Sequence, residues 1–327
     1  MQMERTLDIR TALKRGIAEL RDADVPTYTL AAELLLLHVL GRDRVWLYAH
    51  PEEIVSNLDA HRFVSLITRR AAGEPTQYLT GKQEFWGLEF EVTADVLIPR
   101  PETEHVIEVA LDRLAVREIR CGRKQTLTGE GLDIIDVGTG SGCIAVALAK
   151  ELPAARFVAT DISAAALAVA RRNASRHAVS ERIQFVECNL LVCATASDAA
   201  ASVGGAQHGE PVSSKNLAAD AKGPSEFDLI VSNPPYIGRN EKDSLMREVR
   251  EHEPEIALYG GEEGYEIYAD LIAQAAQRLK PAGLLVLELG HNSLPAVQPL
   301  LDLPGWRNVG ITNDLAGIPR VIAAERA

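Results

Sequence analysis

The sequence predicts an α/β protein: a mostly parallel, doubly wound sheet with an antiparallel edge hairpin, preceded by a small helical bundle and a linking β-hairpin. Three observations lead to this fold class. The N-terminal part has apolar residues at helical spacing, short apolar strands alternate with helices from Leu132 onward, and two strand-like runs close the chain. Strands that alternate with helices are typical of a parallel sheet covered on both faces.

The N-terminal part is predicted to be helical. Apolar residues recur at spacings of four, four and three along one face of its first segment: Ile9, Leu13, Ile17 and Leu20. A second helix is expected over 29–40, with Gly41 as its C-cap, and further helical pattern runs from about 54 to 72. We expect residues 1–79 to form a separate helical domain.

A β-hairpin is predicted next, because residues 84–92 alternate apolar and polar side chains around a glycine. We expect residues 80–95 to link the two domains. The segment 97–104 follows, and its prolines impose an extended backbone before the next predicted helix. Pro101 suits the first turn of a helix that runs to about Ile119.

Residues 96–327 are expected to form the α/β domain. Its predicted strands and helices are strands 132–136, 156–161, 182–187, 227–232 and 284–289, and helices 142–150 and 164–177. The runs 306–312 and 320–324 are predicted to pair as the antiparallel edge hairpin. Residues 192–225 are rich in Ala, Ser and Gly and show no hydrophobic periodicity of a helix or strand. This predicts a flexible insertion.

Composition excludes several classes of protein. The chain has 327 residues, and 34 Lys and Arg against 46 Asp and Glu give a net charge of −12. Such an acidic chain is not expected to coat nucleic acid or an anionic membrane. Aromatic residues make up only 5%, too few for a platform that stacks single strands.

No metal site or membrane segment is expected. The four cysteines form no CxxC pair, and the eight histidines show no HExxH spacing. The first ten residues lack the pattern of a secretory signal, and the apolar stretch 30–40 is too short to span a bilayer. We therefore expect a cytoplasmic protein with reduced thiols.

The first candidate site is the loop Gly138, Thr139, Gly140, Ser141 and Gly142, between a predicted strand and a predicted helix. In open α/β sheets, ligands bind at this position, and glycines let the backbone approach them closely. The spacing is GxGxG, whereas dinucleotide sites use GxGxxG. A tight strand-to-helix turn would also need glycine, so this loop alone is weak evidence.

The second candidate is Asp161, at the end of the next predicted strand, about twenty residues beyond the loop. A carboxylate there can accept both hydroxyls of a ribose. The alternative is that Asp161 caps the following helix, unless Ser163 does so. Together, the loop and the acid indicate a cofactor that contains a nucleoside.

The third candidate is the most specific: Asn233, Pro234, Pro235 and Tyr236, directly after the apolar strand 227–232. Two prolines stiffen the backbone. The side-chain oxygen of Asn233 and the carbonyl of Pro234 can then accept hydrogen bonds from one planar –NH2 group, and Tyr236 can stack on its plane. Such a clamp suits an amide or exocyclic amine that presents its nitrogen to an electrophile.

In this order, the three candidates resemble those of S-adenosylmethionine-dependent amino methyltransferases. The chain is most similar to the PrmC/HemK family of protein-(glutamine-N5) methyltransferases, which modify peptide chain release factors. The resemblance extends over nearly the whole chain and includes the segments 85–90, 97–104 (LIPRPETE), 136–142, 231–237, 253–254, 257–258, 260–268 and 314–320. It implies a Rossmann-like class I methyltransferase domain and a helical domain that binds the release factor.

The resemblance also implies roles for individual residues. Gly138–Gly142 would line the methionine and ribose part of S-adenosyl-L-methionine, and Asp161 would hold the ribose. Asn189 and Leu190 would contact the adenine, although the family usually has an acid where Asn189 stands. Asn233 would touch both cofactor and substrate, and the catalytic residues Asn233, Pro234 and Tyr236, with Pro235, would grip the glutamine side chain. A monomer without direct nucleic-acid contacts is expected.

Three alternatives stay open at this stage. An N6-adenine nucleic-acid methyltransferase uses the same clamp, but the net charge of −12 and the lack of a basic segment disfavour it. An NAD-binding oxidoreductase is disfavoured by the GxGxG spacing. A binding module without activity is disfavoured by the intact NPPY segment.

Overall fold

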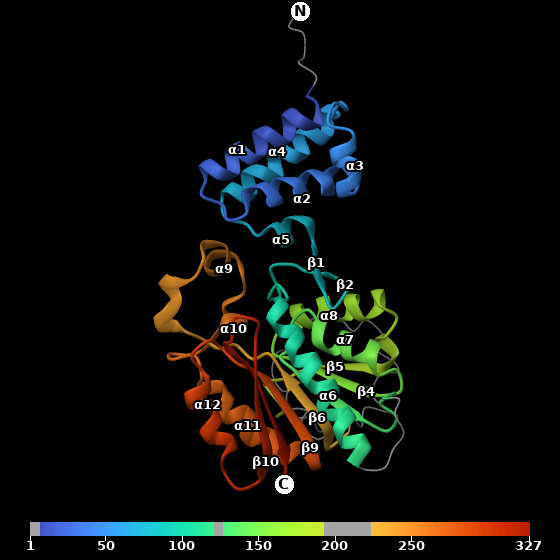
Figure 1. Ribbon diagram of the computed structural model, residues 1–327, viewed down its shortest axis with the longest axis vertical. Helices are drawn as coiled ribbons and strands as arrows, with labels where there is room; N and C mark the ends of the chain where they lie inside the picture. The colour runs from blue at the N-terminus through green and yellow to red at the C-terminus, as the bar shows by residue number, and fades with distance from the viewer. Residues whose placement is uncertain (1–6, 121–126, 193–223) are drawn as a thin grey trace, which may run out of the picture. The chain divides into compact units, whose positions relative to one another are not determined.

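The computed structural model describes residues 7–120, 127–192 and 224–327 (Figure 1). Two compact units make up the chain. The first, which we call the helical unit, comprises Met1–Gln83, Val92–Ala94 and Ser244–Glu253. The second, the sheet unit, comprises Glu84–Glu91, Asp95–Asp243 and Pro254–Ala327.

The helical unit contains short and medium helices: α1 (Ile9–Asp22), α2 (Tyr28–Leu40), α3 (Arg44–Ala49), α4 (Asn57–Ala71), α5 (Thr76–Thr80) and α9 (Arg247–His252). The carboxylate of Asp8 caps α1. Gly41 is the C-cap of α2, as predicted, and has the left-handed conformation. Helices α1 and α4 pack closely, since a Cβ on Gly16 would lie 2.7 Å from Cζ of Phe63. Short α3, α5 and α9 were not predicted.

The hairpin that joins the units is β1 (Lys82–Phe85) and β2 (Leu88–Glu91). Its two-residue turn consists of Trp86 and Gly87, whose φ angles are 55° and 66°. Positive φ at both central residues is the mark of a type I′ turn, which matches the twist of a hairpin. The predicted hairpin is therefore present.

The sheet unit is built on seven strands in the order β10-β11-β9-β6-β3-β4-β5. Their bounds are β3 (Asp133–Val137), β4 (Arg156–Asp161), β5 (Ile183–Glu187), β6 (Phe227–Ser232), β9 (Leu279–Glu288), β10 (Trp306–Asn313) and β11 (Pro319–Arg326). Strands β3, β4, β5, β6 and β9 are parallel, while β11 runs antiparallel to both β9 and β10. The predicted sheet and its edge hairpin are confirmed.

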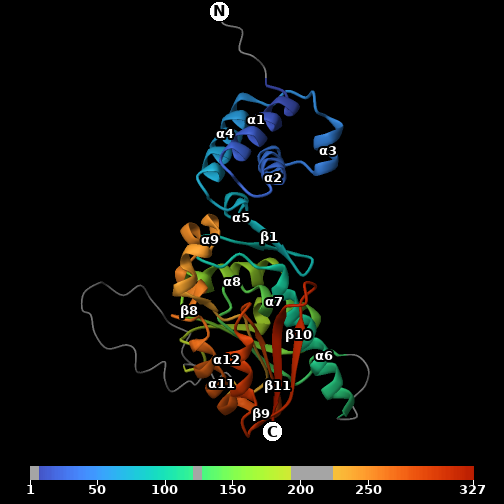
Figure 2. The same cartoon turned by 60° about the vertical axis from the view of Figure 1, so that its left-hand side comes forward.

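Helices cover both faces of this sheet (Figure 2). Helices α6 (Glu104–Arg120), α7 (Cys143–Glu151) and α8 (Ala164–Arg176) contribute to one apolar core, and α11 (Glu266–Arg278) and α12 (Leu294–Leu301) to the other. The central strands β3 and β6 are buried along their whole length, which explains why most of their residues are apolar.

Short elements complete the sheet unit: η1 (Pro101–Thr103), η2 (Ser180–Arg182), β7 (Ile237–Gly238), η3 (Arg239–Ser244), α10 (Glu255–Leu258) and β8 (Tyr259–Gly261). Strands β7 and β8 pair with each other. Residues 193–223, nearly all of the predicted insertion, lie outside the described residues. Of the helices in the described ranges, none has the length and apolar character needed to cross a bilayer.

Candidate active site

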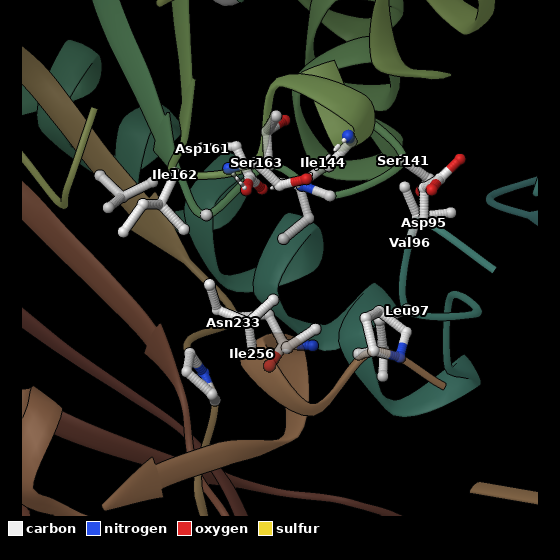
Figure 3. Close-up of a pocket in the computed structure, with 18 of the residues that line it drawn as sticks. Asp95, Val96, Leu97, Ser141, Ile144, Asp161, Ile162, Ser163, Asn233 and Ile256 are labelled. Atoms are coloured by element: carbon white, nitrogen blue, oxygen red, sulfur yellow. Dashed lines mark hydrogen bonds between the residues drawn. The ribbon is translucent and has the colours of Figure 1, made fainter. Parts of the chain in front are cut away.

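A pocket opens in the sheet unit where β3, β4 and β6 end at their carboxyl termini (Figure 3). Nine of the predicted site residues line it: Gly138, Thr139, Gly140, Ser141, Asp161, Asn189, Leu190, Asn233 and Pro235. Gly142, Pro234 and Tyr236 are not among the lining residues. In Figure 3, Asp161, Ile162 and Ser163 lie on one wall, and Asn233 and Ile256 face them. The parallel sheet thus brings together residues that are far apart in sequence.

The glycine loop follows β3. Gly138, Gly140 and Gly142 have φ angles of 71°, 54° and 82°, a region that glycine adopts without strain. Asp136 holds the loop from inside, since its Oδ2 accepts hydrogen bonds from Thr139 Oγ1 at 2.6 Å and from the Ala145 N–H at 3.1 Å. Burial raises the pKa of Asp136 to about 7.

Gly142 has a packing role. A Cβ on this residue would lie 3.1 Å from Cβ of Ala170 in α8. Because glycine has no Cβ, α7 can begin close to α8. Helix α7 follows directly, with Cys143–Ala149 buried.

Asp161 links the loop to the segment after β4. Its Oδ2 accepts from the Gly140 N–H at 2.8 Å and its Oδ1 from the Ser163 N–H at 2.9 Å. The side chain of Ser163, not that of Asp161, caps α8 by accepting from the Ala166 N–H at 3.1 Å. Burial raises the pKa of Asp161. Each carboxylate oxygen has a further lone pair, so Asp161 can still accept hydrogen bonds from a ligand.

Asn189 and Leu190 lie after β5, and both line the pocket. Leu190 has a φ of 54°, unusual for a residue with a Cβ. Its carbonyl accepts a hydrogen bond from Thr160 Oγ1 at 3.2 Å, which helps to hold this conformation. The exposed Asn189 side chain stands where a ligand could be contacted.

The segment Asn233–Tyr236 begins as β6 ends. Ser232 Oγ donates to the carbonyl of Val137 at 2.7 Å and ties the end of β6 to β3. Asn233 Nδ2 donates to Thr103 Oγ1 at 3.0 Å. Because the amide nitrogen has this partner, the oxygen Oδ1 can serve as an acceptor toward the pocket.

Tyr236 lies against the apolar core beside α11 and α12. Its hydroxyl donates to Glu288 Oε1 at 3.1 Å. Glu288 is fully buried, and burial raises its pKa to about 7. Burial, and after it the neighbouring carboxyl group of Glu288, raise the pKa of Tyr236, so its hydroxyl stays protonated.

Glycines leave space for the backbone of this segment. A Cβ on Gly260 would lie 2.2 Å from the carbonyl oxygen of Pro235, and one on Gly264 would lie 2.4 Å from that of Tyr236. A Cβ on Gly290 would lie 2.8 Å from the ring of Tyr236. All three distances are too short for a real Cβ, so these glycines are needed for close packing.

Gly260→Ala should therefore displace Pro235, lower the free energy of unfolding by about 1–3 kcal/mol and reduce activity. Gly131→Ala is a matched control: it strains a residue with φ of 74° but meets no atom within 4 Å. Thermal melting and activity assays of both variants would check this. If the two lost activity equally, the effect of Gly260→Ala would be one of stability alone.

Sequence reasoning assigned no role to two further walls of the pocket. Asp95, Val96, Leu97, Pro99 and Thr103 form one, and Pro254, Ile256, Ala257, Tyr259 and Ile267 contribute to the other. Both fall in or beside segments that carried the family resemblance. Ile162 and Ser163 also line the pocket, and their position directly after Asp161 was the signal that could have identified them.

The family model for the PrmC N-terminal domain matches residues 11–81, and the model for a methyltransferase domain matches 128–288. A release factor glutamine methyltransferase of Koribacter versatilis is 38% identical over 98% of this chain and 99% of its own. Another, of Chlorobaculum tepidum, is 40% identical over 92% of each chain.

A solved structure shares the fold. The catalytic domain of hMettl16, crystallised with MAT2A 3'UTR hairpin 6, matches with a TM-score of 0.50 and 18% identity over 84% of each chain. Fold and site together define a class I methyltransferase with a helical N-terminal region. The chain belongs to the family of release factor glutamine methyltransferases.

Proposed function

We propose that the protein transfers a methyl group from S-adenosyl-L-methionine to the side-chain amide nitrogen (N5) of the glutamine in the Gly-Gly-Gln motif of class 1 release factors. The observation that carries this proposal is the Asn233 side chain. Its Nδ2 is held by Thr103, which leaves Oδ1 at the pocket to accept from a substrate –NH2 group. The family supports the choice of glutamine as substrate.

The pocket suits S-adenosyl-L-methionine. The glycine loop Gly138–Gly142 presents backbone close to the ligand, and Asp161 has lone pairs for the ribose hydroxyls. Asn189 and Leu190 would meet the adenine, where the Asn189 carboxamide oxygen can accept from its amino group. When bound, the cofactor supplies an electrophilic methyl group on a positively charged sulfur.

The protein's task is to orient a poor nucleophile. The lone pair of an amide nitrogen is delocalised into its carbonyl, so alignment contributes much of the rate. Asn233 Oδ1 would accept one N–H bond of the substrate amide; acceptance of the other by the Pro234 carbonyl stays a prediction, because Pro234 is buried and is not among the residues that line the pocket. These acceptors would direct the nitrogen toward the methyl group and stabilise the positive charge that develops on it. The proton leaves after transfer, when the nitrogen is far more acidic. Stacking by Tyr236 stays a prediction.

Transfer of labelled methyl from S-adenosyl-L-methionine tests this function. We expect label on purified release factor, and none on a release factor whose Gly-Gly-Gln glutamine is replaced by glutamate. DNA and RNA containing adenine serve as competing substrates. Label on nucleic acid but not on release factor would replace the proposal with N6-adenine methylation. The expected site of action is the cytoplasm, where release factors work, and the expected form is a monomer.

We further propose that the helical domain, residues 1–79, holds the release factor. On α2, Leu30 and Leu34 lie one turn apart with 44% and 42% of their surface exposed. Replacing both with serine should raise the KM for release factor about tenfold, as expected for losing an apolar contact. The kcat and the Kd for S-adenosyl-L-methionine should not change.

Leu303→Ser is the control for this prediction, because it removes an exposed leucine of the sheet unit. Steady-state kinetics with varied release factor would give KM and kcat separately. An unchanged KM in the doubly substituted protein would exclude this face of α2 as the contact surface.

A further inference from the structure

A buried carboxyl group lies behind the segment Asn233–Tyr236. Glu288 is the last residue of β9, and none of its surface is exposed. Strand β9 runs parallel to β6, with Leu287 paired to Ser232, so Glu288 lies at the edge of the sheet where the segment begins. Its Oε1 accepts a hydrogen bond from Tyr236 Oη at 3.1 Å, and its Oε2 has no hydrogen-bond partner among the described residues. A buried carboxyl group needs a donor, so the bond to Tyr236 is costly to break.

The main chain around Glu288 is held in place. Glu288 pairs with Val321 of β11, and its carbonyl oxygen accepts a hydrogen bond from the buried Tyr268 hydroxyl at 2.7 Å. The ring of Tyr236 packs against the next turn of the chain, since a Cβ on Gly290 would lie 2.8 Å from it. Both the ring and the hydroxyl of Tyr236 therefore rest on a fixed part of the sheet unit.

The segment that follows β6 is thus attached at both ends. At its start, Ser232 Oγ donates to the carbonyl of Val137 at 2.7 Å. At its end, the hydroxyl of Tyr236 donates to Glu288. Between these two attachments lie Asn233 and two prolines, whose rings fix φ and leave few backbone torsions free. A shift of Tyr236 is therefore passed along a stiff backbone to Asn233.

We propose that Glu288 is a positioning residue, which acts through Tyr236 to hold Asn233 where its Oδ1 meets the substrate amide. In this role Tyr236 is an anchor: its hydroxyl is bonded to Glu288, and it is not among the residues that line the pocket. Stacking on the substrate would instead need a face of its ring at the pocket. The inference rests on the proposed function, in which Asn233 Oδ1 accepts from the glutamine.

Tyr236→Phe separates anchoring from stacking, because it removes the hydroxyl and keeps the ring. With release factor and S-adenosyl-L-methionine both saturating, we expect its single-turnover rate to fall about 10–100-fold, the cost of a small misplacement at a reacting centre. The Kd for S-adenosyl-L-methionine should not change. A near-normal rate would overturn the proposal and favour stacking.

Variants of Glu288 test the other end of the same hydrogen bond. Glu288→Leu removes the acceptor, and its rate should fall as in Tyr236→Phe. Glu288→Gln keeps an oxygen that accepts from Tyr236, so it should retain most of the wild-type rate. The double variant Tyr236→Phe/Glu288→Leu removes both partners, which often costs little stability. Its rate should be no lower than that of either single variant, because both act through one hydrogen bond.

Tyr268→Phe is the matched control. It also removes a buried hydroxyl that bonds to Glu288, but this hydroxyl donates to the main-chain oxygen and not to the carboxyl group. Its melting temperature should fall, and its single-turnover rate should not. If Tyr268→Phe slowed methyl transfer as much as Tyr236→Phe, looser packing around β9 would explain both losses, and the positioning proposal would be wrong.

The anchoring can also be followed without a substrate. Hydrogen–deuterium exchange, read by mass spectrometry on the peptide that contains residues 231–238, reports how often this segment opens. Exchange should be faster in Tyr236→Phe and Glu288→Leu than in the wild type or Glu288→Gln. Wild-type protein that fails to methylate release factor but shows this pattern would refute the proposed function and leave the anchoring supported. An active wild type, with Tyr236→Phe and Glu288→Leu equally active, would overturn the positioning proposal alone.

Discussion

Replacing Asn233 with alanine should lower the rate of methyl transfer on the order of 10²–10³-fold, the usual cost of deleting one preorganised polar group at a reacting centre. The variant loses the acceptor Oδ1 but keeps the Pro234 carbonyl. Orientation of the amide nitrogen and stabilisation of its developing charge should both suffer. In the proposed site, the glycine loop and Asp161 would provide most of the binding of S-adenosyl-L-methionine, so its Kd should change little.

Single-turnover experiments at saturating cofactor would measure this effect, because they separate chemistry from binding. Asn233→Asp should be measured alongside Asn233→Ala. It keeps an acceptor at the pocket but loses the –NH2 that donates to Thr103, and it places a negative charge in the site. It should bind substrate without aligning it. Near-normal turnover of Asn233→Ala on glutamine would refute the clamp mechanism.

Asp161→Ala should weaken the binding of S-adenosyl-L-methionine by about one to two orders of magnitude. A hydrogen bond to a charged group contributes about 1.5–3 kcal/mol. In the structure Asp161 also accepts from the N–H groups of Gly140 and Ser163, so the loop loses part of its support in this variant. Calorimetric titration would measure the affinity, and thermal melting would confirm that the variant folds.

Ser163→Ala is the control for Asp161→Ala. It removes the cap of α8, at a cost of about 1 kcal/mol of stability, yet keeps the carboxylate that would bind the ribose. If Ser163→Ala weakened the affinity as much as Asp161→Ala, order in the segment after β4 would explain the loss. Unchanged affinity in folded Asp161→Ala would remove this residue from the cofactor site.

Sequence alone predicted the sheet well because its central strands are buried on both faces and leave a clear apolar signal. Strands β4 and β6 begin and end where predicted, and β3 is shifted by one residue. Helices α11 and α12 were both missed, and in α12 Pro295 and Pro299 interrupt any helical pattern. Strands β7 and β8 have only two or three residues each and arise through pairing across the chain, which no local pattern reveals.

For the pocket, sequence identified the residues that directly follow β3, β4, β5 and β6, because the carboxyl ends of parallel strands share one edge of the sheet. It did not identify partners that act over long sequence distances. Thr103 and Asn233 are 130 positions apart, and Glu288 lies 52 positions beyond Tyr236. A buried glutamate at the end of a strand also has no local mark that separates it from an exposed one.

The central claim is methyl transfer to a glutamine side chain, and identification of the modified atom tests it most directly. Release factor treated with the wild-type protein and S-adenosyl-L-methionine would be digested, and the peptide that contains Gly-Gly-Gln fragmented in a mass spectrometer. We predict the mass of one added methyl group on that glutamine, with N5-methylglutamine recovered after complete enzymatic digestion. A methyl group on another residue, or an unmodified peptide from a fully folded enzyme that binds S-adenosyl-L-methionine, would contradict the account.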